Sequence, residues 1–561
     1  MPTRGDEVRP GDGRPSGAAA RRRSETSSRR LGRLPGLHLL LLAGAAAPFL
    51  LAGALEIARG YRAASDDAVI SFRAWQVLSL HPPLVGQYVL PTGHGPQAYD
   101  LGPALYWLLS VPVHIDPAQG ALWGAALFGA LAAVLCVEAA WSVRGTLGAA
   151  FALLGIALLV AARPLLATDP VWNPDFGLIW LTAAALAGWA VASGRTGWWP
   201  LQVVAASVAA QCHLIYAFTA AALCLLAPLL GLIRTRRAGR WLGYGLAVGV
   251  LCWIPTAVQQ LTAREGNLSA LLRESGRGTG RGAGFGWRLF AAAVEPPTLW
   301  QHGDRLSHLR WLLAQVGSRP GFLGPLLLAV LLAIGALAWW RRRFELAALS
   351  GVAVVAGLGV VVSFALVPRS DTLTLVYLAP AAFPAGLLAW AVICWAAGLG
   401  LLAVLGSPRH ARDDLGRTLP AAGRATITLA ALAVTVASLG PLAADAAGGN
   451  YLVSGWRAIT GTERVVAAAS CEMRRGPVRV EGELSAHPLQ VYAVLTGTIW
   501  ELYGDGWRPT TTPPFSTAFG YSVASPARTD RLITVPDPQP PAGSGRASCR
   551  AGVPGPARAR S

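Results

Sequence analysis

The sequence predicts an all-α polytopic membrane protein with about 11 transmembrane helices and a small extracytoplasmic α/β domain at its C-terminal end. Hydrophobic residues make up 53% of the 561 residues and charged residues only 14%, which is too apolar for a soluble protein of this length. The apolar residues form runs of about 20, the length that crosses a bilayer as a helix. After residue 444 these runs stop, and a mixed strand and helix pattern follows.

Windowed hydropathy gives the positions of the expected spans. They lie at about residues 37–57, 119–141, 145–162, 175–193, 198–216, 217–233, 241–260, 321–340, 344–366, 376–404 and 425–444. The stretch 101–115 is apolar but too short to span, so we expect an interfacial or re-entrant helix there. The expected transmembrane domain, residues 34–444, then has two long outer loops, 58–118 and 261–320.

Arginine accounts for all 47 basic residues, and its distribution predicts the orientation. Residues 1–33, a disordered tail by composition, hold nine arginines and four acidic residues, which the positive-inside rule places in the cytoplasm. An odd number of spans then places the C-terminus outside, in a multi-pass protein of the plasma membrane. The agreement is not complete: Arg59, Arg62, Arg163 and Arg369 are among the arginines that fall on the outer side, and the long outer loop 261–320 is also basic, although long loops obey the rule poorly.

The net charge of +18 does not indicate a nucleic-acid partner. The basic residues lie mainly beside the spans and in the two tails, where anionic membrane lipids are the ordinary partner. Because the chain has no lysine, only arginine or a metal could bind a phosphate here.

Residues 445–535 are the expected extracytoplasmic domain. Residues 478–484 alternate like a strand, and residues 487–503 have the pattern of an amphipathic helix. The tail 536–561 is rich in Pro, Gly, Ser and Arg, and we expect it to be disordered. Cys471 and Cys549 are the two cysteines outside the spans, and an oxidising compartment would suit a disulfide between them.

Soluble active-site motifs are missing from the sequence. The patterns GxxxxGK[ST], GxGxxG, HExxH and paired CxxC do not occur, so ATP-driven transport, nucleotide-cofactor chemistry and a thiolate zinc site have no support. Polar residues gather instead in the outer loops, beginning with Asp66 and Asp67. Asp67 could cap a helix that starts near Ala68, or act as a general base with its pKa raised by burial. Either aspartate could also bind a divalent cation such as Mg or Mn.

Several short motifs resemble a known family. Asp67-Ala68, the stretch Pro82-Pro-Leu-Val-Gly86 and the stretch Gly102-Pro-Ala-Leu-Tyr-Trp107 look like the first outer loop of the GT-C superfamily. Those integral membrane glycosyltransferases include protein mannosyltransferases, aminoarabinose transferases and arabinosyltransferases. The resemblance is closest to actinobacterial members, and it spans roughly residues 35–400. Two departures stand out: Asp66-Asp67 replaces Asp-Glu, and Asp100-Leu-Gly-Pro replaces His-Pro-Gly-Pro.

The resemblance implies a polyprenyl-phosphate sugar as donor and an envelope glycan, glycolipid or protein as acceptor. Asp67 would accept the proton of the acceptor hydroxyl, with Asp66 beside it, and a metal or an arginine such as Arg73 would neutralise the leaving phosphate. The expected substrate-binding residues are Asp100, Asn173, His213, Gln260 and Asn267, together with Arg73. Helix capping by Asn173 and interhelical hydrogen bonding by His213 are equally compatible with the sequence.

A second interpretation remains open. The chain could be a non-catalytic subunit of envelope assembly, or a transporter or flippase of lipid-linked sugars on the same scaffold. A coupled transporter usually places ionisable groups near the bilayer midplane. Here the charges inside the expected spans lie near their ends, as Glu56, Glu138 and Glu345 do. This distribution favours the transferase.

Overall fold

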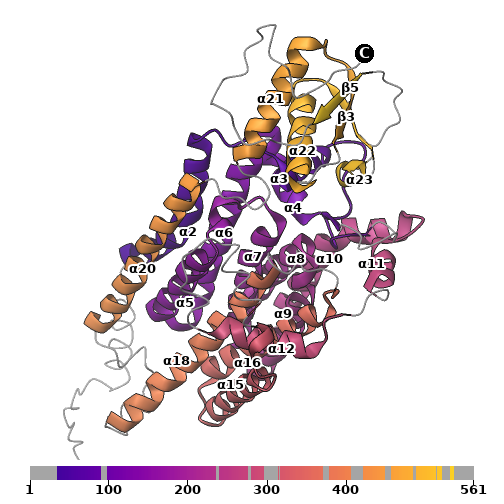
Figure 1. Ribbon diagram of the computed structural model, residues 1–561. Coiled ribbons are helices and arrows are strands. Elements are labelled where there is room, and N and C mark those ends of the chain that lie inside the picture. Colours follow the sequence, from indigo (N-terminus) through magenta and orange to yellow (C-terminus); the bar gives the residue numbers. More distant parts are fainter. Residues whose placement is uncertain are drawn as a thin grey trace, which may run out of the picture.

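A computed structural model describes residues 35–89, 98–235, 239–275, 280–295, 314, 316–369, 378–405, 421–448, 456–483, 488–512, 515–520, 523 and 531–535. The protein is a mostly helical multi-pass membrane protein (Figure 1). Ten helices form the helical body: α2 (Pro35–Ala58), α5 (Gly120–Ala162), α7 (Asn173–Ala192), α8 (Trp199–Cys212), α9 (Ala217–Thr235), α10 (Gly239–Thr262), α15 (Leu323–Trp340), α16 (Phe344–Leu366), α18 (Phe383–Leu405) and α20 (Ala421–Gly448).

Shorter elements connect these helices. The α-helices among them are α3 (Ser65–Gln76), α4 (Ala104–Ile115), α6 (Leu165–Thr168), α11 (Asn267–Ser275) and α12 (Ala283–Val294). The 3-10 turns are η1 (Thr196–Trp198), η2 (Leu214–Tyr216) and η3 (Ala379–Ala382). Strands β1 (Tyr88–Val89) and β2 (Ala98–Tyr99) pair antiparallel.

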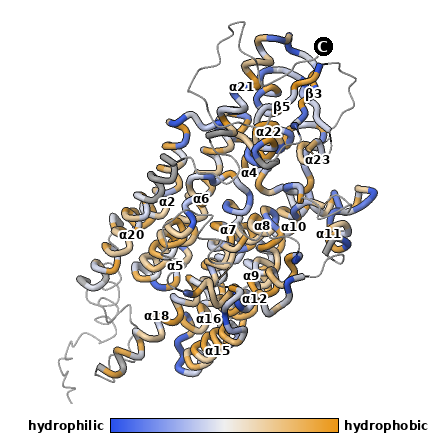
Figure 2. The backbone as a smooth tube through the Cα atoms, in the orientation of Figure 1, coloured by the Kyte–Doolittle hydropathy of each residue, from blue (hydrophilic) through white to orange (hydrophobic). Residues whose placement is uncertain are grey.

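Eight helices of the described residues are long and apolar enough to cross a membrane, and Figure 2 shows hydrophilic residues gathering at their ends and in the connections. The helix α5 contains two of the expected spans. Its 43 residues bend at Arg144 and Gly145, where Gly145 adopts φ +58°, a conformation that glycine reaches without strain. The expected count of about 11 spans is not reproduced, because α8 has only 14 residues and the apolar part of α20 only the stretch Ala425–Gly440.

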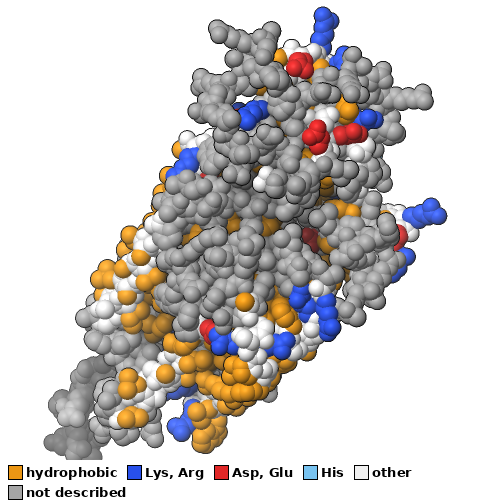
Figure 3. Space-filling view, in the orientation of Figure 1, with side chains coloured by type: hydrophobic (Ala, Val, Ile, Leu, Met, Phe, Trp, Pro, Cys, Tyr) orange, Lys and Arg blue, Asp and Glu red, His pale blue; other side chains and the backbone are white. Residues whose placement is uncertain are grey.

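The outer surface of the helical body is apolar, as expected of a surface that faces lipid. On α15, the side chains of Leu326, Leu332 and Leu337 are each more than half exposed. In Figure 3, hydrophobic side chains cover much of the lower part of the visible face, with arginines near its edges. Such exposure would be costly in water but is favourable in a bilayer.

One end of the helical body, which we call the site end, carries α3, α4, α6 and the C-terminal elements (Figure 1). The expected short helix in residues 101–115 is confirmed as α4, which packs on α3 and α5. The turn between α4 and α5 is stabilised by Asp116, whose Oδ1 accepts hydrogen bonds from the backbone N–H groups of Ala118 and Gln119 at 3.1 Å each.

The C-terminal elements are α21 (Trp456–Glu472), β3 (Pro477–Gly482), α22 (Pro488–Gly504), β4 (Arg508–Thr510), α23 (Phe515–Phe519) and β5 (Leu532–Val535). The expected strand and helix are β3 and α22. The three strands form a parallel sheet in the order β4-β3-β5. Cys471 is disulfide-bonded, and its expected partner Cys549 lies outside the described residues. The helix α22 packs directly on α3, so these elements are in contact with the first outer loop.

Candidate functional site

Two carboxylates lie in the first turn of α3, at the site end. The helix begins at Ser65 and its N-cap position is Ala64, whose side chain makes no capping bond. The expectation that Asp67 caps a helix starting near Ala68 is therefore wrong: the helix begins three residues earlier and includes Asp67. Ser65 adopts φ +55°, a strained conformation for a residue with a side chain. The positive end of the helix dipole at this turn favours negative charge.

Asp67 is hydrogen-bonded to a second carboxyl group. Its side chain is 2% exposed, and its Oδ2 accepts a 2.7 Å hydrogen bond from the hydroxyl of Tyr61. A further hydrogen bond joins it to the carboxyl group of Asp169. Burial raises the pKa of Asp67 to about 7, and the charge of Asp66 adds to the rise, while the hydrogen bonds from Tyr61 and Asp169 oppose it. Near neutral pH, Asp67 can therefore both accept and release a proton.

The partner of Asp67, Asp169, was not among the residues expected from the sequence. It follows α6 and precedes α7, whereas Asp67 lies in the first turn of α3. Burial, and then the charges of Asp67 and Asp175, raise the pKa of Asp169 well above its ordinary value. Asp169 is thus the protonated member of the pair. An acidic residue between two spans was the available signal, and it is the same signal that pointed to Asp67.

A buried ion pair lies beside this pair of carboxyl groups. Arg163 donates from Nε and Nη2 to the two carboxylate oxygens of Asp175, at 2.9 and 3.0 Å, and its side chain is 2% exposed. Its guanidinium also lies over the ring of Trp172, 5.6 Å from the centroid. The positive charge of Arg163 acts against the rise in the pKa of Asp169. Arg163 was an exception to the positive-inside rule. It lies on the expected outer side because it is buried in an ion pair with Asp175.

Asp66 is surrounded by neutral donors. Its Oδ1 accepts from Gln87 Nε2 at 3.2 Å and from the hydroxyl of Tyr492 at 3.0 Å, and its Oδ2 accepts from Trp172 Nε1 at 3.1 Å. Burial raises the pKa of Asp66, and these three hydrogen bonds oppose the rise. The donors come from the first outer loop, from the segment before α7 and from α22.

The arrangement of Asp66 and Asp67 does not fit the expected Mg or Mn site. A hard cation requires several oxygen ligands with free lone pairs, whereas both oxygens of Asp66 already accept hydrogen bonds. Within the described ranges, no group of three or more His, Cys, Asp or Glu side chains could hold a metal ion.

Several of the expected substrate-binding residues come together around Asp100. Its Oδ2 accepts from Asn173 Nδ2 at 3.1 Å and its Oδ1 from the backbone N–H of Leu214 at 3.0 Å. The amide of Asn267 exchanges two 2.9 Å hydrogen bonds with the backbone of Tyr99, the residue before Asp100. Burial raises the pKa of Asp100 to about 8, and the nearby charge of Asp66 adds to the rise. The group joins the first outer loop to α7, η2 and α11.

Three other expected residues have different surroundings. His213 Nδ1 accepts a 3.2 Å hydrogen bond from the backbone N–H of Ile215. Gln260 caps α11, because its Oε1 accepts a 3.0 Å hydrogen bond from the backbone N–H of Leu268. Arg73 donates to Gln76 Oε1 at 2.7 Å and lies 5.9 Å from the ring centroid of Tyr106. Burial lowers the pKa of Arg73, because its positive charge is partly removed from water.

No family model and no curated protein matches the chain. Among solved structures, it is similar to ArnT from Cupriavidus metallidurans, in the apo state, at 16% identity and a TM-score of 0.41 over 87% of each chain. It is also similar to an oligosaccharyltransferase from Archaeoglobus fulgidus tethered with an acceptor peptide, at 13% identity and a TM-score of 0.36, over 82% of this chain and 63% of that one. A likeness at these values carries no functional argument.

Proposed function

We propose that the protein is an integral membrane glycosyltransferase that moves a sugar from a polyprenyl-phosphate donor to an envelope glycan, glycolipid or protein on the outer face of the membrane. The observation that supports this function best is the pair of Asp67 and Asp169. Two carboxyl groups are hydrogen-bonded to each other in a buried site at the ends of apolar helices. A general base works best when its pKa lies near the working pH, and burial brings Asp67 into that range.

The reaction requires one proton acceptor. The acceptor hydroxyl attacks the anomeric carbon, the new C–O bond forms as the bond to the lipid phosphate breaks, and the hydroxyl proton moves to Asp67. Asp169 stabilises the carboxylate form of Asp67 by donating its hydrogen bond. Asp66 lies beside this base and is oriented by its three neutral donors.

Arg73 is the arginine best suited to the leaving phosphate. Its described contacts are with the neutral oxygens of Gln76 and Phe519 and with Tyr106. Arg62, by contrast, is bound to two glutamates. A partly buried cation that has no carboxylate among its described contacts attracts an anion. Tyr106 and Gln87 connect Arg73 to Asp66, because the hydroxyl of Tyr106 donates to Gln87 Oε1 at 2.9 Å.

The positions of the charged groups favour this function over coupled transport. Asp66 and Asp67 follow α2, Asp169 precedes α7, and Asp175 lies in the first turn of α7. All of them lie at helix ends, where a lipid-linked head group could meet an acceptor from the aqueous side, and not at the middle of a span.

The test is transfer from a panel of purified polyprenyl-phosphate sugars by the full-length protein in lipid vesicles, with release of polyprenyl phosphate as the readout. The Asp67→Asn variant should lose activity, and Asp505→Asn, the same change at an exposed aspartate near the end of α22, should not. Mass spectrometry of lipid-linked sugars in a deletion strain would identify the donor that accumulates. Wild-type turnover by Asp67→Asn would show that Asp67 is not the base, and a wild type that releases polyprenyl phosphate from no donor would favour the non-catalytic alternative.

A further inference from the structure

The C-terminal elements are seated on α3, the helix that carries Asp66 and Asp67. The ring of Phe72 on α3 contacts three rings of the C-terminal elements, with centroid separations of 6.2 Å to Trp500, 4.9 Å to Tyr503 and 5.3 Å to Phe519. Phe72 is completely buried. An aromatic cluster of this kind stabilises through apolar burial and edge-to-face geometry, so α3 and α22 are held together by a core contact.

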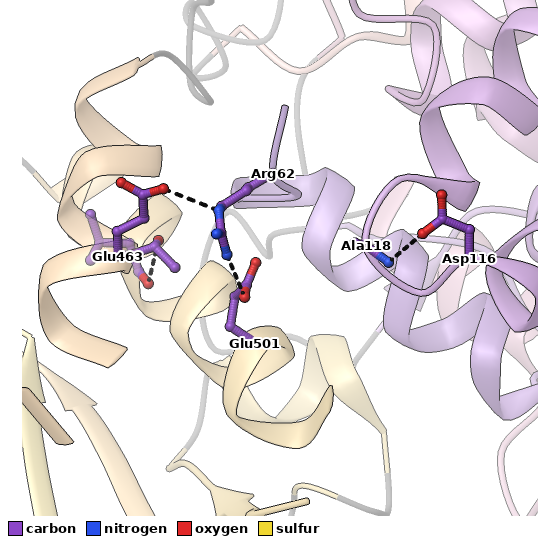
Figure 4. A network of polar contacts seen from close by, with 7 residues as sticks. Arg62, Asp116, Ala118, Glu463 and Glu501 are labelled. Atoms are coloured by element: carbon purple, nitrogen blue, oxygen red, sulfur yellow. Dashed lines mark hydrogen bonds and ion pairs between the residues drawn. The ribbon is translucent and has the colours of Figure 1, made fainter. Parts of the chain in front are cut away.

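Ion pairs also join the segment before α3 to the C-terminal elements. Figure 4 shows Arg62, just before α3, between Glu463 of α21 and Glu501 of α22. Its Nε lies 3.1 Å from Glu463 and its Nη1 2.9 Å from Glu501. Because these side chains are partly exposed, each ion pair adds little stability, but the two together fix the register of the contact.

A glycine permits the close approach of α22 to this region. A Cβ atom at Gly497 would lie 2.5 Å from Thr462 Oγ1 and 3.3 Å from the backbone oxygen of Ala63. Any side chain at this position would push α22 away from α21 and from the segment before α3. The packing therefore depends on this glycine.

A side chain of α22 also forms a hydrogen bond with the candidate site. Tyr492 of α22 donates its hydroxyl to Asp66 Oδ1 at 3.0 Å, across 426 residues of sequence. The ring of Tyr492 is fixed beside Phe515, at a centroid separation of 5.9 Å. Burial and the charge of Asp66 raise the pKa of Tyr492, so its hydroxyl stays protonated and remains a donor.

We propose that the C-terminal elements are a component of the active site, and that Tyr492 is a positioning residue that holds Asp66 beside the base Asp67. This inference rests on the proposed transferase function. Without the Tyr492 hydroxyl, Oδ1 of Asp66 keeps only its 3.2 Å bond from Gln87. The carboxylate is then held by Gln87 and Trp172 alone among its described donors, so its charge acts on the base from a less fixed position.

The test compares Tyr492→Phe with Tyr503→Phe in the full-length protein. Both variants remove one hydroxyl from α22, and both keep the aromatic ring. We expect Tyr492→Phe to lower kcat about tenfold, the scale of one hydrogen bond to a charged group, while KM for the donor changes less than twofold. Tyr503→Phe should stay within twofold of wild type in both constants.

A double-mutant cycle with Asp66→Asn separates positioning from a general loss of structure. If Tyr492 acts through Asp66, adding Tyr492→Phe to Asp66→Asn should change kcat less than twofold. Additive losses, or wild-type activity of Tyr492→Phe, would overturn the proposal. Should the wild type be inactive toward every donor, the proposed function fails, and the same cycle on thermal unfolding then decides whether the contact exists. Additive shifts in Tm would overturn it.

Discussion

The substitution Asp67→Asn tests the base at the centre of the site. An amide keeps the size of the side chain and can still accept the hydrogen bond from Tyr61. Its NH2 group can donate to Asp169, so the pair stays connected. The substitution removes only the ability of this side chain to accept a proton, and we expect transfer to slow by about 10² to 10⁴-fold.

The same substitution should not destabilise the protein. Burial raises the pKa of Asp67 from 3.8 to about 7, so this group lowers the stability of the folded state as the pH rises from about 4 to about 7, and the full penalty is present above pH 7. The difference between the two pKa values corresponds to at most about 4 kcal/mol. At pH 8, Asp67→Asn should therefore be at least as stable as the wild type while it is far less active.

The assay is kcat/KM against pH for the wild type, with Tm measured in parallel for both proteins. Because Asp67 must be deprotonated to act, wild-type activity should fall as the pH drops below about 7. A marked fall in Tm of Asp67→Asn at pH 8 would show that the carboxylate is structural. An acid limb near pH 4 would show that its pKa is not raised, and either result would refute the reasoning.

Three further predictions concern the surroundings of the base, and one concerns topology. Asp169→Asn should lower kcat and shift the acid limb of kcat/KM to higher pH, because an amide donates to Asp67 more weakly than a carboxyl group does; an unchanged pH profile would contradict this. Arg163→Gln should destabilise the protein by about 3–5 kcal/mol, as a thermal-unfolding comparison would show, because it leaves Asp175 buried without its cation. Wild-type stability should fall as the pH rises from about 4 to about 8, because the folded state then binds more protons than the unfolded state; Asp100→Asn should flatten this dependence, and equal slopes would argue against it. A cysteine at position 505 should react with an impermeant reagent in intact cells, and its protection until permeabilisation would reverse the predicted orientation.

Much of the helical body could be predicted from the sequence, because long apolar runs form helices wherever a bilayer solvates them. Three local patterns also located shorter elements: the apolar stretch 101–115 located α4, the alternation in 478–484 located β3, and the amphipathic pattern in 487–503 located α22. The structure does not confirm the exact span count: eight of its described helices are long and apolar enough to span, and α5, counted once among them, holds two of the expected spans. Expected span 198–216 is divided between α8 and η2, and only part of α20 is apolar enough.

The sequence alone pointed to Asp66 and Asp67, because acidic residues beside apolar helices are costly and therefore conspicuous, and the resemblance of the outer-loop motifs added the group around Asp100. It did not show the bond from Asp67 to Asp169, or the bond from Asp66 to Tyr492. These contacts join segments about 100 and 426 residues apart, and no local pattern encodes such a distance. The sequence thus pointed to Asp66, Asp67 and Asp100. Only the contacts of α3 with the segment before α7 and with α22 added Asp169 and decided which carboxyl group is paired, which is oriented and which can act as a base.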